Sequence, residues 1–378
     1  MNILVCYWQF PEHDKHSTAL RITEIVSIFL KQGDNVTFFA DHRFSYSKAN
    51  EKYKQFLENS GVECFSCVNK YPQNITDFIE LISKHKFDVA VFLHYFIFND
   101  YASQLRKTQP DCHLILDTVD LHFLREKRQA EVTRTENCRK QAENTRLREF
   151  RALQDADSVW VVTEKEKEIL LKSIIKIDFN ISVIPNIHRN YDKLIGFEKT
   201  NGIVFLGGYR FPPNKDAIEF FMKEIHPILN KSLPGLKITI AGSSPPKHFS
   251  NYKDIFPNVN VSGFIKDHRT MIKSHRVAIA PLRFGAGMKG KIGEYLCCGL
   301  PVVTTSIGAE GFGFNGNEVI IADNPKDFAK GVIQLYSYKE IWETYRNNGV
   351  SFMKQFTPES VGKKLRRIIK SLDTNLRQ

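Results

Sequence analysis

The stretch that decides the fold reads PLRFGAGMKGKIGE at residues 281–294 and continues as GLPVVTT at residues 299–305. A glycine-rich turn precedes a segment that is expected to be helical from near Met288 to residue 298, and a short apolar strand follows. Glycine carries no side chain, so the backbone N–H groups around Gly285, Gly287 and Gly290 can approach a diphosphate closely. The positive end of the predicted helix would attract the same anion.

One acidic residue stands on this predicted helix. Glu294 lies seven residues beyond Gly287, which is about two helical turns, so the two positions are expected to share a helix face. A carboxylate there could accept hydrogen bonds from both hydroxyls of a ribose. The stretch therefore predicts a nucleotide-sugar site, and a plain strand–turn–helix connection with a solvated glutamate is the simpler alternative.

The first half of the chain alternates short apolar strands with amphipathic helices. A helix is expected over about 19–31, where Ile22, Ile25, Ile28 and Phe29 share one face. Strands are expected at residues 3–7, 36–40, 88–93, 114–117, 157–163 and 182–186. Strands that alternate with helices indicate a parallel, doubly wound sheet.

A second alternating series follows in the other half of the chain. Its strands are expected at residues 202–208, 236–242, 259–263, 277–281, 301–305 and 319–322. Residues 187–200 lack a clear periodicity and are expected to link the halves, because 378 residues exceed what one core usually encloses. The sequence predicts an α/β protein with two Rossmann-like domains, whose ligands bind at the carboxyl ends of the strands.

The composition favours anionic ligands. The 53 Lys and Arg against 42 Asp and Glu give a net charge of +11, which suits nucleotide diphosphates, nucleic acid or an acidic membrane surface. The N-terminus reads as a strand and no apolar run spans a membrane, so a cytoplasmic protein is expected, with peripheral contact at the inner membrane surface left open. Cys64 and Cys67 have metal or redox spacing without a second pair, so reduced thiols and no metal site are expected.

The 281–305 stretch resembles the donor-binding signature of glycosyltransferase family 4, whose members have the GT-B fold. That family usually carries two glutamates separated by seven residues, and the second one holds the ribose. Glu294 matches the second acid, whereas Ala286 stands where the first acid would touch the transferred sugar.

The resemblance extends over most of the chain and implies a domain organisation. It implies an N-terminal acceptor-side domain over 1–186, a linker over 187–200 and a nucleotide-sugar domain over 201–356. A last helix over 357–378 would return to the N-terminal domain. Both parallel sheets are expected to face a central cleft.

A second glycine turn follows the first strand of the second half. The sequence FLGGYRFPPNK at residues 205–215 places Gly207 and Gly208 at a strand's carboxyl end, where Arg210 or Lys215 could neutralise a phosphate. An ordinary turn with exposed cations is the alternative. The family uses a cation pair on this loop to stabilise the leaving diphosphate, which implies a catalytic role for Arg210 and Lys215. Other cations compete for that role: Arg283, Lys289 and Lys291.

The family holds the nucleobase with a segment that corresponds to Gly263 and Phe264, which follow a strand. An apolar ring beneath the base is the implied role of Phe264, and a core position is the alternative. The resemblance thus implies ten nucleotide-binding residues: Gly207, Gly208, Gly263, Phe264, Gly285, Gly287, Met288, Lys289, Lys291 and Glu294.

The strongest signal in the first half is DTVDLHFLREKR at residues 117–128, directly after a buried strand. His122 stands there among Asp117, Asp120, Arg125 and Glu126. The stretch resembles the family's Asp-x-His sequence, whose histidine contacts the donor sugar and the reaction centre. His122 and Asp120 are therefore expected to be catalytic, and a structural histidine is the alternative.

Two predicted helices are strongly charged. The helix over about 134–152 carries opposite charges three or four residues apart, which indicates an exposed, self-paired helix. Near the C-terminus an apolar stripe includes Val361 and Leu365. The opposite face is basic, and it is either a solvated face or a membrane-surface contact: Lys363, Lys364, Arg366, Arg367 and Lys370.

The resemblance implies a glycosyltransferase that moves a sugar from a nucleotide diphosphate-sugar to a hydroxyl acceptor with retention, in glycan, polysaccharide or glycoconjugate biosynthesis. Preorganised N–H groups and cations would stabilise the leaving diphosphate, so no cofactor or metal is expected. The acceptor can be a glycan, a lipid-linked glycan or a protein. Two alternatives stay open: a nucleotide-sugar epimerase of the same fold and, with no recognisable nucleic-acid module, a basic nucleic-acid-binding protein.

Overall fold

A computed structural model describes residues 1–42, 50–67, 74–173, 179–189 and 193–376. The chain forms two compact units. Unit 1 comprises Met1–Lys127, Thr135–Ile187 and Pro358–Gln378, and unit 2 comprises Arg128–Arg134 and His188–Thr357. Of the expected linker over 187–200, residues 190–192 lie outside the described residues.

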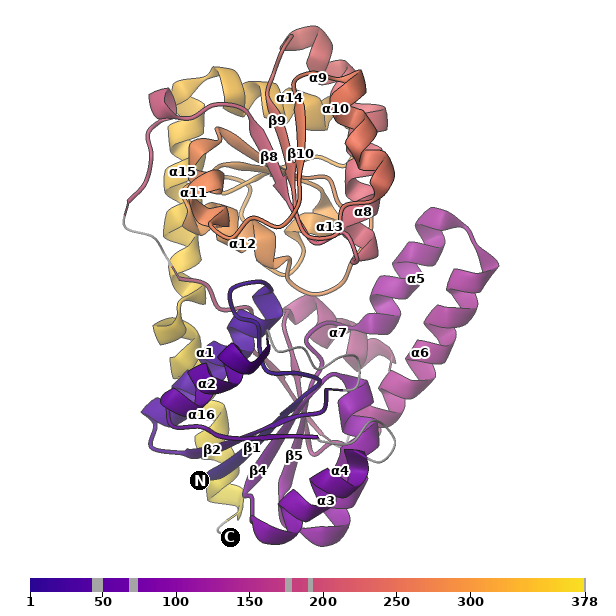
Figure 1. Cartoon of the computed structure of the whole chain (residues 1–378), viewed down its shortest axis with the longest axis vertical. Coiled ribbons are helices and arrows are strands. Elements are labelled where there is room, and N and C mark those ends of the chain that lie inside the picture. The colour runs from indigo at the N-terminus through magenta and orange to yellow at the C-terminus, as the bar shows by residue number, and fades with distance from the viewer. Residues whose placement is uncertain (43–49, 68–73, 174–178, 190–192, 377–378) are drawn as a thin grey trace. The chain divides into compact units, whose positions relative to one another are not determined.

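Unit 1 is built on a seven-stranded sheet with the order β3-β2-β1-β4-β5-β6-β7, and its strand pairs are parallel (Figure 1). The chain order reverses between β1 and β4, which is the position where open α/β sheets bind ligands at their carboxyl edge. The strands are β1 (Asn2–Tyr7), β2 (Asn35–Ala40), β3 (Glu63–Ser66), β4 (Val89–Leu93), β5 (His113–Asp117), β6 (Ser158–Val161) and β7 (Asn180–Val183).

Helices connect these strands and cover the sheet of unit 1. They are α1 (Ser17–Lys31), α2 (Glu51–Asn59), α3 (Asn74–Lys84), α4 (Tyr95–Thr108), α5 (His122–Thr133), α6 (Glu136–Asp155), α7 (Glu164–Ser173) and α16 (Pro358–Leu376).

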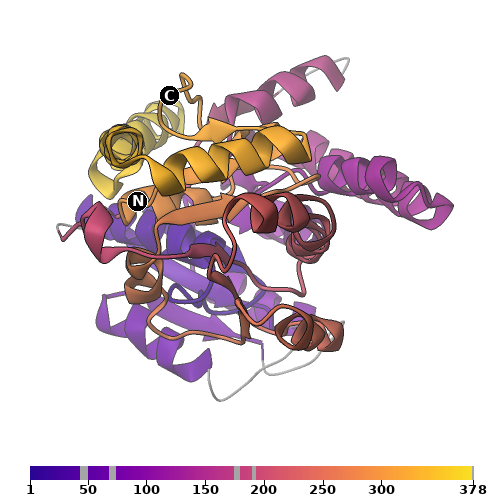
Figure 2. The same cartoon turned by 90° about the horizontal axis from the view of Figure 1, so that it is seen from above.

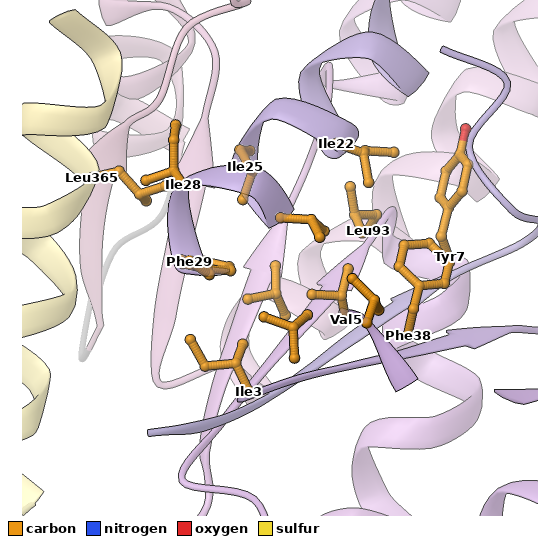
Figure 3. Close-up of a cluster of buried hydrophobic side chains, with 14 of the residues drawn as sticks. Ile3, Val5, Tyr7, Ile22, Ile25, Ile28, Phe29, Phe38, Leu93 and Leu365 are labelled. Atoms are coloured by element: carbon orange, nitrogen blue, oxygen red, sulfur yellow. The ribbon is translucent and has the colours of Figure 1, made fainter. Parts of the chain in front are cut away.

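The core of unit 1 explains why the last helix packs there. Figure 3 shows Ile3 and Val5 of β1 facing Ile22, Ile25 and neighbouring side chains of α1. The apolar stripe of α16 joins the same core through four buried residues, of which Leu365 lies beside Ile28 in Figure 3: Val361, Leu365, Ile369 and Leu372. The exposed face of α16 carries its Lys and Arg residues.

Unit 2 has a six-stranded sheet with the order β10-β9-β8-β11-β12-β13, again with parallel pairs. Helix α14 (Pro325–Ser337) lies alongside this sheet (Figure 2). Its residues Phe328, Val332 and Leu335 belong to one hydrophobic core with Ile279 and Val303 of the sheet. The strands are β8 (Ile203–Leu206), β9 (Ile238–Ala241), β10 (Val259–Ser262), β11 (Val277–Ala280), β12 (Val302–Thr304) and β13 (Ile320–Ile321).

The other helices of unit 2 are mostly short. They are α8 (Pro212–Phe220), α9 (His226–Ser232), α10 (Asn251–Ile255), α11 (His268–Ser274), α12 (Gly290–Cys297), α13 (Ser306–Ala309) and α15 (Lys339–Phe352). The 3-10 helices are η2 (Phe197–Lys199), η4 (Lys247–Ser250) and η5 (Met353–Phe356), and η3 (Phe221–Ile225) is a π-helix. Two parallel α/β units confirm the predicted fold class.

The edge strand β3 was not predicted. Its sequence, Glu-Cys-Phe-Ser, is short, and its burial is partial because the strand lies at the edge of the sheet. Cys64 belongs to this strand, and Cys67 follows it. Burial raises the pKa of Cys64 to about 12, which keeps this thiol protonated and unreactive at neutral pH.

The helix expected over about 134–152 is confirmed as α6, although it begins two residues later and one of its glutamates is not part of the self-paired pattern. The backbone breaks at Arg134, which has φ 55°, so α5 ends at Thr133 and α6 begins at Glu136. The exposed pair between Glu143 and Arg146 matches the self-paired pattern. Glu149, however, is buried and accepts hydrogen bonds from the backbone instead.

Candidate functional site

The glycine-rich turn of unit 2 is longer than predicted, and its helix begins later. Helix α12 starts at Gly290 rather than near Met288, since Gly287 has φ 65°, a left-handed conformation that keeps the turn out of the helix. Glu294 is thus the fifth residue of α12, about one turn from its start, so the expected shared helix face with Gly287 does not exist. Met288 is buried beside the turn.

Glu294 is held in a charged environment that the sequence did not reveal. The residue is 9% exposed, and its Oε1 accepts a hydrogen bond of 2.9 Å from Arg269 Nε and lies 3.4 Å from His268 Nε2. Burial raises the pKa of the carboxyl group, but hydrogen bonds from His268 and Arg269 outweigh it and bring the pKa to about 2. Glu294 is therefore an ionised acceptor at neutral pH.

A buried histidine packs closely against α12. His188 is 2% exposed, and a Cβ atom added to Gly293 would lie 2.4 Å from its Nε2. Burial lowers the pKa of His188 to about 4, so the ring is neutral and packs as an aromatic body. The glycine next to Glu294 is thus required for this close contact.

Lys291 connects α12 to the second glycine turn. Its Nζ donates a 2.5 Å hydrogen bond to Asn214 Oδ1 and lies 4.0 Å from the ring centroid of Phe205. Asn214 Nδ2 in turn donates to the carbonyl of Gly208 at 2.8 Å. A Cβ atom on Gly207 would lie 2.8 Å from the Lys291 ammonium, so glycine lets this cation reach the turn. Burial lowers the pKa of Lys291 to about 7.

The other candidate cations are placed less favourably for this role. Arg210 is exposed. Lys215 is also exposed and faces Glu219 of its own helix at 3.8 Å. Arg283 is paired with Asp216 through a 2.9 Å hydrogen bond from Nε, and Lys289 Nζ donates to the carbonyl of Gly287 at 2.7 Å. Among the cations that the sequence left unranked, Lys291 is the one that contacts the Gly207–Gly208 turn.

The proposed base-binding segment follows β10. The carbonyl of Gly263 accepts a 3.2 Å hydrogen bond from the N–H of Gly242, which ties two neighbouring strand ends together. Phe264 is 55% exposed, so the alternative of a core position for this ring is wrong.

In unit 1, the predicted catalytic residues lie where β5 meets α5. His122 Nδ1 lies 3.4 Å from Asp120 Oδ1 and 3.8 Å from Glu149 Oε1. Arg125 donates a hydrogen bond to the other oxygen of Asp120. The carboxyl group of Glu149 accepts hydrogen bonds from the backbone N–H groups of His122 (3.1 Å) and Phe123 (2.9 Å), which caps α5.

Burial sets the protonation of this cluster. It lowers the pKa of His122 to about 4 and raises that of Glu149 to about 8. Burial also raises the pKa of Asp120, but the Arg125 cation outweighs it and leaves that pKa below the ordinary value. Asp120 is thus a carboxylate facing a neutral imidazole.

The loop that carries Asp120 is fixed by a buried ion pair. Arg21 of α1 donates to Asp117 Oδ2 at 2.6 Å and to the carbonyl of Ile184 at 2.9 Å, and neither side chain of the pair is exposed. Asp117 Oδ1 also accepts the N–H of Val119 at 3.1 Å, and Val119 has φ 63°. A β-branched residue rarely adopts that angle, so the pair holds a strained turn beside the cluster.

One histidine of this cluster was missed by the sequence analysis. His94 follows β4, and its ring lies 5.1 Å from that of His122. Ligand atoms of His94, Asp120 and His122 all lie within 4.8 Å of one another, an arrangement that could hold a metal ion. The Arg125 guanidinium on Asp120 already neutralises that carboxylate, which opposes a second cation.

Comparison with known proteins gives matches for both the sequence and the structure. Residues 200–338, within unit 2, match the family model described as glycosyl transferases group 1. A curated Klebsiella pneumoniae protein, described as an uncharacterized 44.6 kDa protein in the cps region, is 29% identical over 184 residues. That match spans 46% of this chain and 47% of the relative, so it covers about half of each.

Solved structures resemble nearly the whole chain. Sucrose-phosphate synthase from Thermosynechococcus elongatus has a TM-score of 0.74 at 14% identity, over 99% of this chain and 100% of that one. HepE of Anabaena in complex with UDP and glucose has a TM-score of 0.68 at 14% identity, over 98% and 100%. TarM of S. aureus in a complex that includes UDP has a TM-score of 0.71 at 10% identity, over 97% and 99%.

The part of the chain that the structure describes contains no helix both apolar and long enough to cross a membrane. At these low identities the structural likenesses establish the fold alone. The chain thus has the GT-B fold of these structures, and its residues 200–338 match the glycosyl transferases group 1 family.

Proposed function

We propose that this protein transfers a sugar from a nucleotide diphosphate-sugar to a hydroxyl acceptor, with retention of the anomeric configuration, in polysaccharide or glycoconjugate biosynthesis. The observation that carries the proposal is the pair of charged side chains on α12. Glu294 is a buried, ionised acceptor, and Lys291 places an enclosed ammonium against the Gly207–Gly208 turn. A carboxylate for a ribose and a cation for a diphosphate stand three residues apart on one short helix.

The leaving diphosphate would be stabilised by this chain's own groups. Lys291 offers a positive charge in a partly buried position, where an electrostatic contact is stronger than in water. The glycine turns let backbone N–H groups approach the phosphate oxygens. No step of this scheme calls for a metal or a cofactor beyond the donor substrate.

His122 would contact the sugar at the reaction centre. Its Nδ1 faces Asp120, which favours the tautomer with the proton on Nδ1 and leaves the Nε2 lone pair for a hydroxyl. Asp120 and Glu149 then act as positioning residues, since one orients the ring and the other fixes the backbone of His122. The nucleobase is left open, although the UDP in the HepE and TarM complexes favours testing UDP first.

The proposal is tested with a panel of nucleoside diphosphates and their sugar conjugates. One member of the panel, with UDP conjugates tried first, should raise the melting temperature by several degrees at saturation, because a ligand that binds only the folded state stabilises it. The same conjugate should release its nucleoside diphosphate on incubation with the protein. A flat response to UDP, GDP, CDP, ADP and dTDP would refute the proposal, and isomerised sugar without acceptor would instead indicate an epimerase.

The acceptor is proposed to be presented at an anionic membrane surface, as a lipid-linked glycan. Helix α16 exposes five cations on one face, while its apolar stripe is buried in unit 1: Lys363, Lys364, Arg366, Arg367 and Lys370. Exchange of Lys363 and Lys364 for Gln should weaken binding to vesicles that contain anionic lipid roughly 30-fold, since each charge near such a surface contributes about 1 kcal/mol.

Vesicle flotation at low and high salt measures this effect. The matched control exchanges two exposed cations of α6, Arg139 and Lys140, and should leave flotation unchanged. Equal loss in both double variants would show that net charge alone attracts the protein, and no flotation of the unmodified protein would remove the membrane from the proposal.

A further inference from the structure

His94 occupies a backbone conformation that suits glycine. It has φ 72° and ψ 145°, and this geometry is fixed by two hydrogen bonds: its N–H donates to the carbonyl of Asp117 at 2.9 Å, and its carbonyl accepts the N–H of Phe98 at 3.2 Å. Residues with a Cβ atom rarely adopt such angles, and the strain is commonly retained at functional sites. The sequence therefore places an imidazole where backbone stability alone would favour glycine.

The imidazole of His94 lies in an aromatic setting at the carboxyl edge of the sheet. It stacks on Phe96, with ring centroids 5.1 Å apart and planes at 12°, and on Tyr7 of β1 at 5.8 Å and 27°. The ring of His122 meets it edge-on at 5.1 Å and 83°. The side chain is 9% exposed, and its Nδ1 is buried without a hydrogen-bond partner among the described residues.

The two histidines differ in what surrounds their Nδ1 atoms. His122 Nδ1 also makes no hydrogen bond among the described residues, but it lies 3.4 Å from Asp120 Oδ1. The nearby carboxylate favours the proton on Nδ1, which leaves Nε2 as a hydrogen-bond acceptor. His94 Nδ1 has no hydrogen-bond partner among the described residues. Burying a nitrogen lone pair without a partner costs less free energy than burying an unpaired N–H group. The proton of His94 therefore belongs on Nε2, which becomes a donor.

We propose that His94 is a second sugar-contacting residue, which donates a hydrogen bond from Nε2 to a sugar hydroxyl whose proton His122 Nε2 accepts. A hydroxyl group both donates and accepts, so two neutral imidazoles of opposite tautomer match it. Both rings are neutral at pH 7, because burial lowers the pKa of His94 to about 3 and that of His122 to about 4. The inference rests on the proposed function and deepens it, since the ligand is a pyranose hydroxyl of the donor or of the acceptor.

The test separates the imidazole from the backbone strain. His94→Gly relieves the strained angle and removes the donor, so we expect an unchanged melting-temperature response to UDP but at least tenfold slower release of UDP from the UDP-sugar. His94→Asn should recover part of that loss, because asparagine tolerates positive φ and supplies an N–H donor. Arg134→Gly is the matched control: it relieves a φ of 55° in an exposed residue and should leave the rate unchanged.

Two assay formats identify which sugar carries the hydroxyl. Release of UDP with water as the only acceptor reports on the donor, and transfer to octyl glucoside reports on the acceptor as well. An equal loss in both assigns the hydroxyl to the donor sugar, whereas a loss confined to transfer assigns it to the acceptor. Both outcomes support the proposal.

Three results would overturn the inference. The first is a His94→Gly variant with full activity in both formats. The second is a His94→Asn variant as inactive as the glycine variant, and the third is an NMR tautomer measurement that places the His94 proton on Nδ1. Failure of the proposed function looks different, since the unmodified protein would then respond to no nucleotide at all.

Discussion

Replacing Glu294 with alanine is expected to abolish the stabilisation that a nucleoside diphosphate gives the protein. A hydrogen bond to a charged group contributes about 1.5–3 kcal/mol, and two ribose hydroxyls on one carboxylate therefore contribute about 3 kcal/mol or more. Loss of that amount weakens binding by a factor of more than 100. Calorimetric titration of the variant with the best nucleotide of the panel measures the loss.

A matched control separates binding from folding. Glu318 is also a buried glutamate of unit 2, 8% exposed, and it accepts backbone N–H groups of Asn315 and Asn317 at 3.0 and 3.2 Å. Glu318→Ala should destabilise the protein and still bind the nucleotide. If Glu294→Ala keeps its nucleotide affinity, the ribose role is wrong, whatever happens to its stability.

Replacing Lys291 with methionine is expected to lower kcat by about 100-fold to 1000-fold, the usual cost of removing one preorganised group that stabilises developing charge. The diphosphate gains negative charge as the glycosidic bond breaks, and Lys291 is the cation that contacts the Gly207–Gly208 turn. Methionine keeps the length of the side chain and its contact with Phe205, so the packing is largely preserved. Steady-state release of the nucleoside diphosphate gives the rate.

The pH dependence of binding offers a second measure of Lys291. Its pKa is lowered to about 7 by burial, so the free protein loses this charge as the pH rises above that value. Affinity for the diphosphate should therefore fall between pH 7 and about 9 in the unmodified protein. The methionine variant should lack this trend, and exchange of the exposed Lys215 for alanine should change neither rate nor pH profile.

The fold was predictable because buried parallel strands have continuous apolar sequences. The strand at Val89–Leu93 reads Val-Ala-Val-Phe-Leu and is buried along its whole length. The edge strand β3 has no such run, since only part of it is covered, and it was missed. The start of α12 was placed too early, because glycine spacing does not reveal that Gly287 adopts a left-handed angle.

The candidate site was predictable where its residues are close in sequence. Gly287, Lys291 and Glu294 belong to one turn and helix, so the stretch already suggested a nucleotide. The partners of Glu294 could not be found, because His268 and Arg269 lie on another helix that is brought near only by folding. The ranking of Lys291 above Arg210 likewise depends on burial and contact, which sequence spacing does not encode.

His94 could not be predicted from the sequence for a different reason. In the sequence it only marks the end of an apolar run, and an isolated histidine is usually structural. Its backbone angle of 72° and its neighbour His122 emerge only once β4 and β5 are paired. The role proposed for His94 is inferred from its backbone conformation, which the sequence pattern does not reveal.

A crystal structure of the protein with UDP or a UDP-sugar tests the central claim most directly. We expect the ribose hydroxyls on the carboxylate of Glu294 and a phosphate oxygen within hydrogen-bond distance of Lys291 Nζ, next to Gly207 and Gly208. A nucleotide bound elsewhere, with the Glu294–Arg269 pair undisturbed and no phosphate near Lys291, would contradict the account.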